Sequence, residues 1–427
     1  MAAERRSAEA FPRSWARRAI LAAACAGLLA RLTFGLGYWV GKPLTNDEQE
    51  YLTLARNLAD GRGFTYGSLG TVREFGRAPG YPAFVALIAL VDPLPPAPAA
   101  VPASVKTAQA FVGAVGVFLI GLLAQRTAGP RAGAVAAAVA AIYPPLVWIC
   151  AYALSEALYS TLALLTAFVL DRSLDWMRGR PFTPGFALAG LVGAAAAMTR
   201  PVMLIFLALA ALWLLRRRLG REALAFAAAA ALVIAPWTAR NIRETGRFVL
   251  IAPQGGVNFW IGNNALARGE GDLAANPELK AADEALRGLH PGLDAAALEP
   301  IYYRAAIDDI AAHPVGWLGL LARKTVYQWI PIGPSYRLHS DRYFIASVVS
   351  YVVLLPCAVA GLLGLARRER LPGSLLLLAG SEVLAGLIFF PQERYRIPVI
   401  DPTLIVCAAA WAAHAFRASD ERVPPSR

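Results

Sequence analysis

Asp47 and Glu48 form an acidic pair directly after the first hydrophobic stretch of the chain. A carboxylate that reaches a substrate hydroxyl can remove its proton as a general base. Glu48 also has a structural explanation, because Thr45 and Glu48 match a capping box, and acidic side chains in a first helical turn gain about 0.3–1 kcal/mol. Asp47 lies four residues before Tyr51, on the apolar face of a helix that Gly61 would end. We therefore predict a chemical role for Asp47, with Glu48 as a helper beside its capping role.

A third acidic residue and two arginines fall at a predicted membrane edge. Glu156 follows Ser155 between two hydrophobic stretches, where it fits either a helix start or a substrate contact. Arg394 and Arg396 flank Tyr395 on the outer side, against the usual excess of positive charge on the cytoplasmic side. Topology explains these arginines poorly, so we predict phosphate contacts, with anchoring in the aromatic belt as the alternative.

Three further basic residues are candidates for binding a lipid phosphate. Arg77 begins the segment Arg-Ala-Pro-Gly-Tyr-Pro, and its guanidinium fork suits a phosphate, although ordinary lipid headgroups would attract it too. Arg200 precedes Pro201 at the end of a hydrophobic stretch and is a weaker candidate. Lys324 lies in an amphipathic segment, where lysine side chains commonly extend toward the membrane surface.

The composition is that of a membrane protein. The 427 residues are 57% hydrophobic and 16% charged, with mean hydropathy +0.48, whereas soluble chains are about 45–50% apolar and about 25% charged. We predict an all-α polytopic membrane protein with about ten transmembrane helices and external amphipathic helices. The net charge of +12 sits mostly in short basic clusters between apolar spans, which indicates topology and not a nucleic-acid partner. The predicted spans are residues 18–40, 103–124, 132–151, 154–171, 183–199, 201–215, 222–237, 343–366, 372–391 and 397–416.

The orientation depends on one apolar segment, residues 81–91, which is too short to span and precedes a proline-rich stretch. If this segment lies along the outer face, the basic clusters fall in the cytoplasm, as the positive-inside rule requires. We therefore expect an inner or plasma membrane protein with a cytoplasmic N-terminus. It divides into an N-terminal transmembrane catalytic module (1–237) that contains the first external loop (41–102), a long external loop (238–342), and C-terminal helices with a short cytoplasmic tail (343–427).

The long external loop begins with glycine-rich sequence and continues with two predicted helices, 298–312 and 315–329. Gly255-Gly256 and Gly262 are interpreted as turns. These turns could shape a pocket for sugar or acceptor, although loop geometry alone also accounts for them. The pocket candidates are Tyr81, Asn258 and Asn263.

Metal-ligand patterns are weak. The four cysteines lie in apolar spans, which predicts neither a disulfide nor a zinc site. His313 has no second histidine at ligand spacing. A bound divalent metal is therefore an alternative that no sequence motif supports.

The order of these motifs resembles the membrane-embedded glycosyltransferases of the GT-C fold, most closely the bacterial branch related to protein O-mannosyltransferases and lipid A sugar transferases. The resemblance covers nearly the whole chain and rests on the order and sidedness of the motifs, since none is specific alone. The motifs are Asp47-Glu48, Arg77 to Pro82, Leu154-Ser155-Glu156, Arg200-Pro201, Pro236 to Asn241, Gly255 to Phe259, Gly262 to Asn264, and Arg394 to Pro398.

The resemblance implies that a hexose or pentose moves, with inversion, from a polyprenyl-phosphate donor to an acceptor hydroxyl on the extracytoplasmic face. It implies that Asp47 is the general base, that Glu156 orients substrate or helps to hold a metal, and that Arg77 faces the lipid phosphate. Such chemistry also needs positive charge near the departing phosphate.

The sequence carries no motif that selects the sugar, the acceptor (lipid, glycan or protein), the metal dependence or the oligomeric state. A transporter or lipid flippase is the main alternative function, and a membrane scaffold is a third. Inverted repeats and broken midspan helices, which are typical of transporters, are not evident in the sequence.

Overall fold

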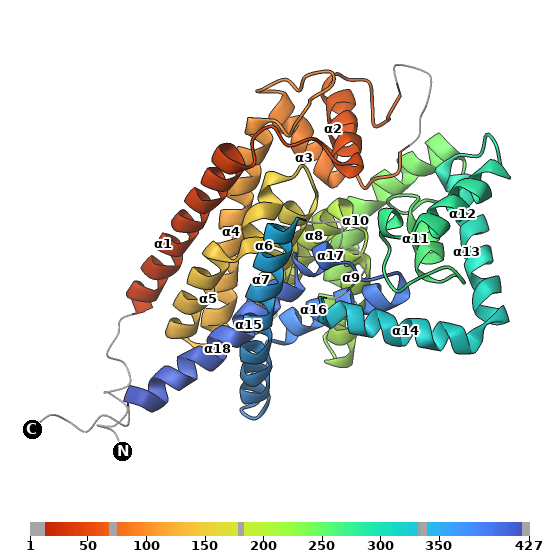
Figure 1. The fold of residues 1–427 in the computed structure, drawn as a ribbon. Coiled ribbons are helices and arrows are strands. Elements are labelled where there is room, and N and C mark those ends of the chain that lie inside the picture. The colour runs from red at the N-terminus through yellow and green to blue at the C-terminus, as the bar shows by residue number, and fades with distance from the viewer. Residues whose placement is uncertain (1–12, 68–74, 178–182, 332, 334–339, 421–427) are drawn as a thin grey trace, which may run out of the picture.

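The computed structural model describes residues 13–67, 75–177, 183–331, 333 and 340–420, so the last residues of the predicted cytoplasmic tail lie outside it. Within these ranges the chain forms helices and connecting turns without any strand, which confirms the all-α prediction. Figure 1 shows α1, α4 and α5 side by side, with α11–α13 gathered at the opposite side of the molecule. The elements are α1 (Arg13–Leu32), η2 (Thr33–Tyr38), α2 (Asn46–Ala59), α3 (Gly80–Ala89), α4 (Ala103–Ala128), α5 (Pro130–Ile142), α6 (Pro144–Trp148), η3 (Ile149–Ala151), α7 (Glu156–Trp176), α8 (Thr183–Thr199), α9 (Met203–Arg216), α10 (Gly220–Thr245), α11 (Gly255–Gly262), η4 (Leu273–Ala275), α12 (Pro277–Gly288), α13 (Ala295–Ala312), α14 (Pro314–Trp329), α15 (Asp341–Ala366), α16 (Gly373–Ile388), α17 (Glu393–Arg396) and α18 (Ile400–Asp420).

Five helices of the described chain are long and apolar enough to cross a membrane, and α5 with α6 adds a sixth if the bent pair is one span. The five are Ser14–Tyr38, α4, α7, α10 and α15. All six match predicted spans, whereas the other four predicted spans coincide with the shorter apolar helices α8, α9, α16 and α18. The chain is a multi-pass membrane protein, and the count of ten spans stays a prediction.

A buried arginine of α1 binds the end of α5, just before the 62° bend between α5 and α6. Arg31 is 3% exposed, and it donates to the carbonyl oxygens of Gly27, Ala141 and Ala140 at 2.9, 3.3 and 3.4 Å. The last carbonyls of a helix have no partner within the helix. Arg31 therefore stabilises the end of α5 before the chain turns toward Glu156.

The helix α10 extends further than predicted. The loop was expected from residue 238, but α10 continues to Thr245 and ends at Gly246, whose φ is +67°. The following segment folds back along the helix. Thr238 donates to the carbonyl of Leu250 at 2.7 Å, and Asn241 donates to that of Ile251 at 3.1 Å. The polar residues after the apolar span thus have partners inside the protein.

The glycines predicted as turns instead form the helix α11, so that prediction was wrong. A Cβ atom on Gly256 would overlap the carbonyl oxygen of Glu299, and one on Gly262 would overlap that of Phe389. At either glycine, an added Cβ atom would lie well inside the van der Waals distance from that carbonyl oxygen. These glycines therefore allow α11 to pack closely against α13 and the end of α16.

The position of α2 is fixed by its first turn, where the predicted capping box is present. The Thr45 side chain accepts from the Glu48 N–H at 3.4 Å, and Glu48 Oε2 accepts from the Thr45 N–H at 2.8 Å. Glu48 Oε1 accepts from the Ala153 N–H at 2.9 Å, which joins α2 to the turn before α7. At the other end Gly61 has φ +71°, as expected for a residue that terminates a helix.

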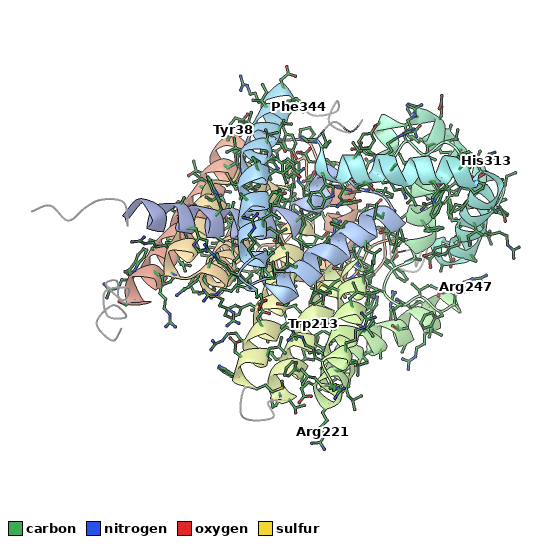
Figure 2. All side chains as sticks on the ribbon, turned by 90° about the horizontal axis from the view of Figure 1, so that it is seen from below. Tyr38, Trp213, Arg221, Arg247, His313 and Phe344 are labelled. Atoms are coloured by element: carbon green, nitrogen blue, oxygen red, sulfur yellow. The ribbon has the colours of Figure 1, made fainter. Side chains whose placement is uncertain are left out.

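The two helices predicted in the long loop are present as α13 and α14, and the short segment 81–91 is the helix α3. Figure 2 shows α14 lying across the direction of α15, with His313 at its far end. This placement agrees with a helix that does not run parallel to the spans.

Candidate active site

Asp47 is held between two arginines that come from distant parts of the chain. Its Oδ1 lies 2.6 Å from Nη2 of Arg77, and its Oδ2 lies 2.7 Å from Nη1 of Arg394. Burial alone would raise the pKa of Asp47, but Arg394 and Arg77 lower it to about 2. Asp47 is therefore a carboxylate at neutral pH, with both oxygens engaged.

Glu156 joins the same network at the start of α7. Its Oε1 lies 2.8 Å from Nη1 of Arg200 and 4.0 Å from Nε of Arg394. The Glu156 side chain is 2% exposed, and its Oε2 is buried without a hydrogen-bond partner. Arg200 also donates to Ser155 Oγ at 3.2 Å. We call the set Asp47, Arg77, Glu156, Arg200 and Arg394 the arginine–carboxylate cluster.

Aromatic rings fix the three guanidinium groups of this cluster. Arg200 lies 4.8 Å and Arg394 lies 5.3 Å from the ring centre of Tyr395. Arg77 lies 5.2 Å from the ring centre of Tyr51. Cation–π contacts restrict the arginines without neutralising their charge. The cluster therefore presents preorganised positive charge beside two carboxylates, an arrangement suited to binding a phosphate.

Glu50 belongs to this site and was missed from the sequence. Its Oε2 lies 2.6 Å from Nε of Arg77, so one guanidinium joins Asp47 and Glu50. Residues three apart face the same side of a helix. The spacing of Glu50 from Asp47 on α2 was the available signal.

Two predicted phosphate-binding residues have other partners. Nζ of Lys324 is buried and donates to Asn263 Oδ1 at 2.9 Å and to the Leu387 carbonyl at 3.0 Å. These bonds join α14 to the ends of α11 and α16, so we assign Lys324 and Asn263 to packing. Nε of Arg396 lies 2.8 Å from Oδ1 of Asp401, and both side chains are buried. Arg396 thus serves the core beside the cluster that holds Arg394.

The other two pocket candidates are Tyr81, which lies in the core, and Asn258, which is partly exposed. Tyr81 is fully buried, donates to Gln109 Oε1 at 3.1 Å and packs edge-on against Tyr51 at 4.9 Å. Tyr81 therefore packs against α2. Asn258 is half-buried on α11.

The carboxylates of the site are engaged by arginines in this structure. Mg²⁺ commonly binds proteins through one or two carboxylates together with water and substrate phosphate. Asp47 instead gives both oxygens to arginines, and Glu156 gives one. Among the described residues, no group of three or more His, Cys, Asp or Glu side chains could hold a metal ion.

Comparison with known proteins identifies the fold. No family model and no curated protein matches the sequence. The structure is similar to the oligosaccharyltransferase AglB of Archaeoglobus fulgidus in complex with an inhibitory peptide and a dolichol-phosphate, with a TM-score of 0.57 and 15% identity over 97% of this chain and 52% of that one. A second structure of the Archaeoglobus enzyme, tethered to an acceptor peptide, gives a TM-score of 0.59 and 14% identity over 95% of this chain and 50% of that one. ArnT from Cupriavidus metallidurans bound to undecaprenyl phosphate gives a TM-score of only 0.40, at 14% identity over 97% of this chain and 82% of that one.

The architecture is that of the GT-C fold glycosyltransferases, to which AglB belongs. This chain spans about half the length of the AglB structures. Identity at this level establishes the fold alone. The relation to the protein O-mannosyltransferase branch stays a prediction.

Proposed function

We propose that the chain transfers a sugar from a polyprenyl-phosphate donor to an acceptor hydroxyl at the extracytoplasmic face, with Asp47 as general base and inversion at the anomeric carbon. The observation that carries this proposal is the arginine–carboxylate cluster, in which Asp47 and Glu156 meet three arginines within a GT-C fold. The dolichol-phosphate and the peptide in the AglB structures support a lipid-phosphate donor and a separate acceptor.

The proposed step balances without a cofactor. The acceptor oxygen forms a bond to the anomeric carbon while the bond from that carbon to the phosphate oxygen breaks. The acceptor proton passes to the Asp47 carboxylate, and the electron pair of the breaking bond leaves with the polyprenyl phosphate. Arg200 and Arg394, which meet at Tyr395, stabilise the charge that develops on that phosphate.

The ion pairs of Asp47 give donor binding a second role. A carboxylate with a pKa of about 2 is a weak base, because a general base works best with a pKa near the operating pH. The donor phosphate competes with Asp47 for Arg394. Once Arg394 turns to the phosphate, Asp47 keeps only Arg77 against the effect of burial, and the pKa of Asp47 rises. Donor binding thereby makes Asp47 a stronger base.

Sugar transfer by an Asp47→Asn variant tests the assignment. The asparagine amide keeps the shape of the side chain but cannot take a proton. We expect membranes that contain the variant to lose transfer of labelled sugar from a polyprenyl-phosphate donor to envelope acceptors, with normal insertion and abundance. Asp60→Asn, at the exposed end of the same helix, is the matched control. Transfer that persists in Asp47→Asn would remove the general-base role.

The transporter alternative predicts a different product. A flippase would move a labelled polyprenyl-phosphate sugar across the bilayer of a proteoliposome without forming a glycosidic bond. Proteoliposomes that hold the labelled donor and an acceptor on the same side of the bilayer separate the two functions, because only a transferase forms a glycosidic bond there.

A further inference from the structure

A cavity of about 480 Å³ lies between the first external loop and the helices α11–α13. Its lining includes Glu50, Tyr66 and Arg77 from the first loop and Gln254 and Glu299 from the second. Its size is in the range of about 300–1,000 Å³ that is typical of small-molecule sites. The position between α2 and α13 means that both external loops must fold before the cavity exists.

The cavity is joined to the catalytic carboxylate by one side chain. Arg77 lines the cavity, pairs with Glu50 inside it and pairs with Asp47 beyond it. Tyr66, which also lines it, donates to Glu50 at 3.5 Å and accepts from the Gly76 N–H at 3.1 Å. A ligand in the cavity therefore contacts the same guanidinium that holds the base.

The polar groups of the walls favour a ligand that brings hydrogen-bond donors. Carboxylate oxygens accept hydrogen bonds, and the cavity is lined by Glu50 from α2 and Glu299 from α13. The two arginines of the lining are already paired, Arg77 as described and Arg287 with Asp283 at 3.0 Å. An anionic ligand in the cavity would thus have to displace a carboxylate from Arg77 or from Arg287.

We propose that this cavity binds the acceptor and that the bound part of the acceptor is a hydroxyl-rich carbohydrate. This inference rests on the proposed function. A sugar ring carries hydroxyl groups around its whole edge, so it can donate to Glu50 and Glu299 at the same time. A serine or threonine side chain offers one hydroxyl, which can donate a hydrogen bond to only one of the two carboxylates. The part of the acceptor that carries the attacking hydroxyl extends past Arg77 toward Asp47, which lies outside the cavity lining.

Binding to the full-length protein in detergent tests the inference without any turnover. The probes are methyl hexosides and methyl pentosides, a serine-containing peptide and glycerol phosphate, measured by titration calorimetry. We expect at least one glycoside to bind and to bind at least ten-fold more weakly to Glu299→Gln. Glu284→Gln on the neighbouring helix α12, where the side chain is 67% exposed, is the matched control and should bind normally.

A second variant keeps the inference testable if Glu299→Gln fails to fold. Ala295→Phe fills the cavity from its α13 side without removing a polar group, and it should abolish glycoside binding. The carbohydrate assignment would be overturned if no glycoside binds, while the peptide or glycerol phosphate does bind and loses its binding in Ala295→Phe. Glycoside binding that neither variant alters would overturn the location.

The proposed function and this inference fail in different ways. Glycosides that bind in the cavity of a protein that transfers no sugar would refute the transferase function and leave the cavity assignment standing. Sugar transfer with an acceptor KM that is unchanged in Glu299→Gln and Ala295→Phe would refute the cavity and leave the transferase standing.

Discussion

Nη1 of Arg394 lies 2.7 Å from Oδ2 of Asp47, although the two residues come from opposite ends of the chain. Nε of the same arginine lies 4.0 Å from Glu156. One side chain on the short helix α17 therefore influences both carboxylates of the cluster. Its removal therefore tests phosphate stabilisation and activation of the base together.

Arg394→Gln should slow the reaction and shift its pH dependence. Loss of one charge-stabilising group commonly lowers kcat by about 10²–10³-fold. In the wild-type protein the pKa of Asp47 is about 2, so kcat/KM should stay flat down to low pH. Without Arg394, burial raises the pKa of Asp47, so the acidic limb of the kcat/KM profile should move to higher pH. Arg342→Gln, at the exposed start of α15, should leave the profile unchanged.

The same profiles test whether the donor activates the base. The acidic limb of kcat reports the enzyme–substrate complex, whereas that of kcat/KM reports the free enzyme. In the wild type we expect the kcat limb to lie at higher pH than the kcat/KM limb. Coincident limbs would show that Arg394 stays on Asp47 throughout the reaction.

Glu156→Gln should destabilise the protein, because it removes the carboxylate partner of the half-buried Arg200. Removal of one member of a fully buried ion pair costs about 3–5 kcal/mol, which is an upper limit for this pair. The double variant Glu156→Gln/Arg200→Gln should recover much of the thermal stability and none of the sugar transfer. A double variant as active as the wild type would show that the pair serves only the fold.

Lys324→Met tests the packing role of the buried lysine. Burial lowers the pKa of Lys324 to about 7, from 10.5 in the unfolded chain. Between these values the unfolded chain binds more protons, so stability should rise with pH across this window and should fall as pH drops toward 7. The variant should lose this slope and keep the wild-type KM for the donor. An increase in that KM would instead support phosphate binding by Lys324.

Sugar transfer should persist in EDTA. The carboxylates of the cluster are paired with arginines, and the described residues offer no metal site. Activity in purified protein before and after chelation, with Mg²⁺, Mn²⁺ and Ca²⁺ added back, checks this. Loss on chelation and recovery with one cation would mean that Asp47 exchanges its arginines for a metal when substrate binds.

The local features of α2 could be predicted from the sequence because they depend on near neighbours. The capping box of Thr45 and Glu48 and the stop at Gly61 need only residues within the same helix. The distribution of basic clusters along the sequence also predicts that Asp47, Arg77, Glu156 and Arg394 lie on one face, and the structure brings them into one cluster.

The features that failed depend on distant partners. Gly256 and Gly262 suggest turns until Glu299 and Phe389 are seen within reach of an added Cβ. Lys324 suggests a surface lysine until Asn263 is seen beside it. Likewise Glu299 had no signal of its own, because its cavity is formed by two loops far apart in the chain.

The single helical turn of α17 carries two arginines with different duties. A four-residue helix does not hold its own orientation, since helix formation needs many residues to offset its costly first turn. The buried pair of Arg396 and Asp401 supplies that orientation, with the Tyr351 ring 3.6 Å from the guanidinium. A genetic screen for cells that lose the sugar modification should therefore recover substitutions at Asp401 and Tyr351, among apolar helices that touch no substrate. Suppressors of such alleles should map to neighbours that restore the tilt of α17.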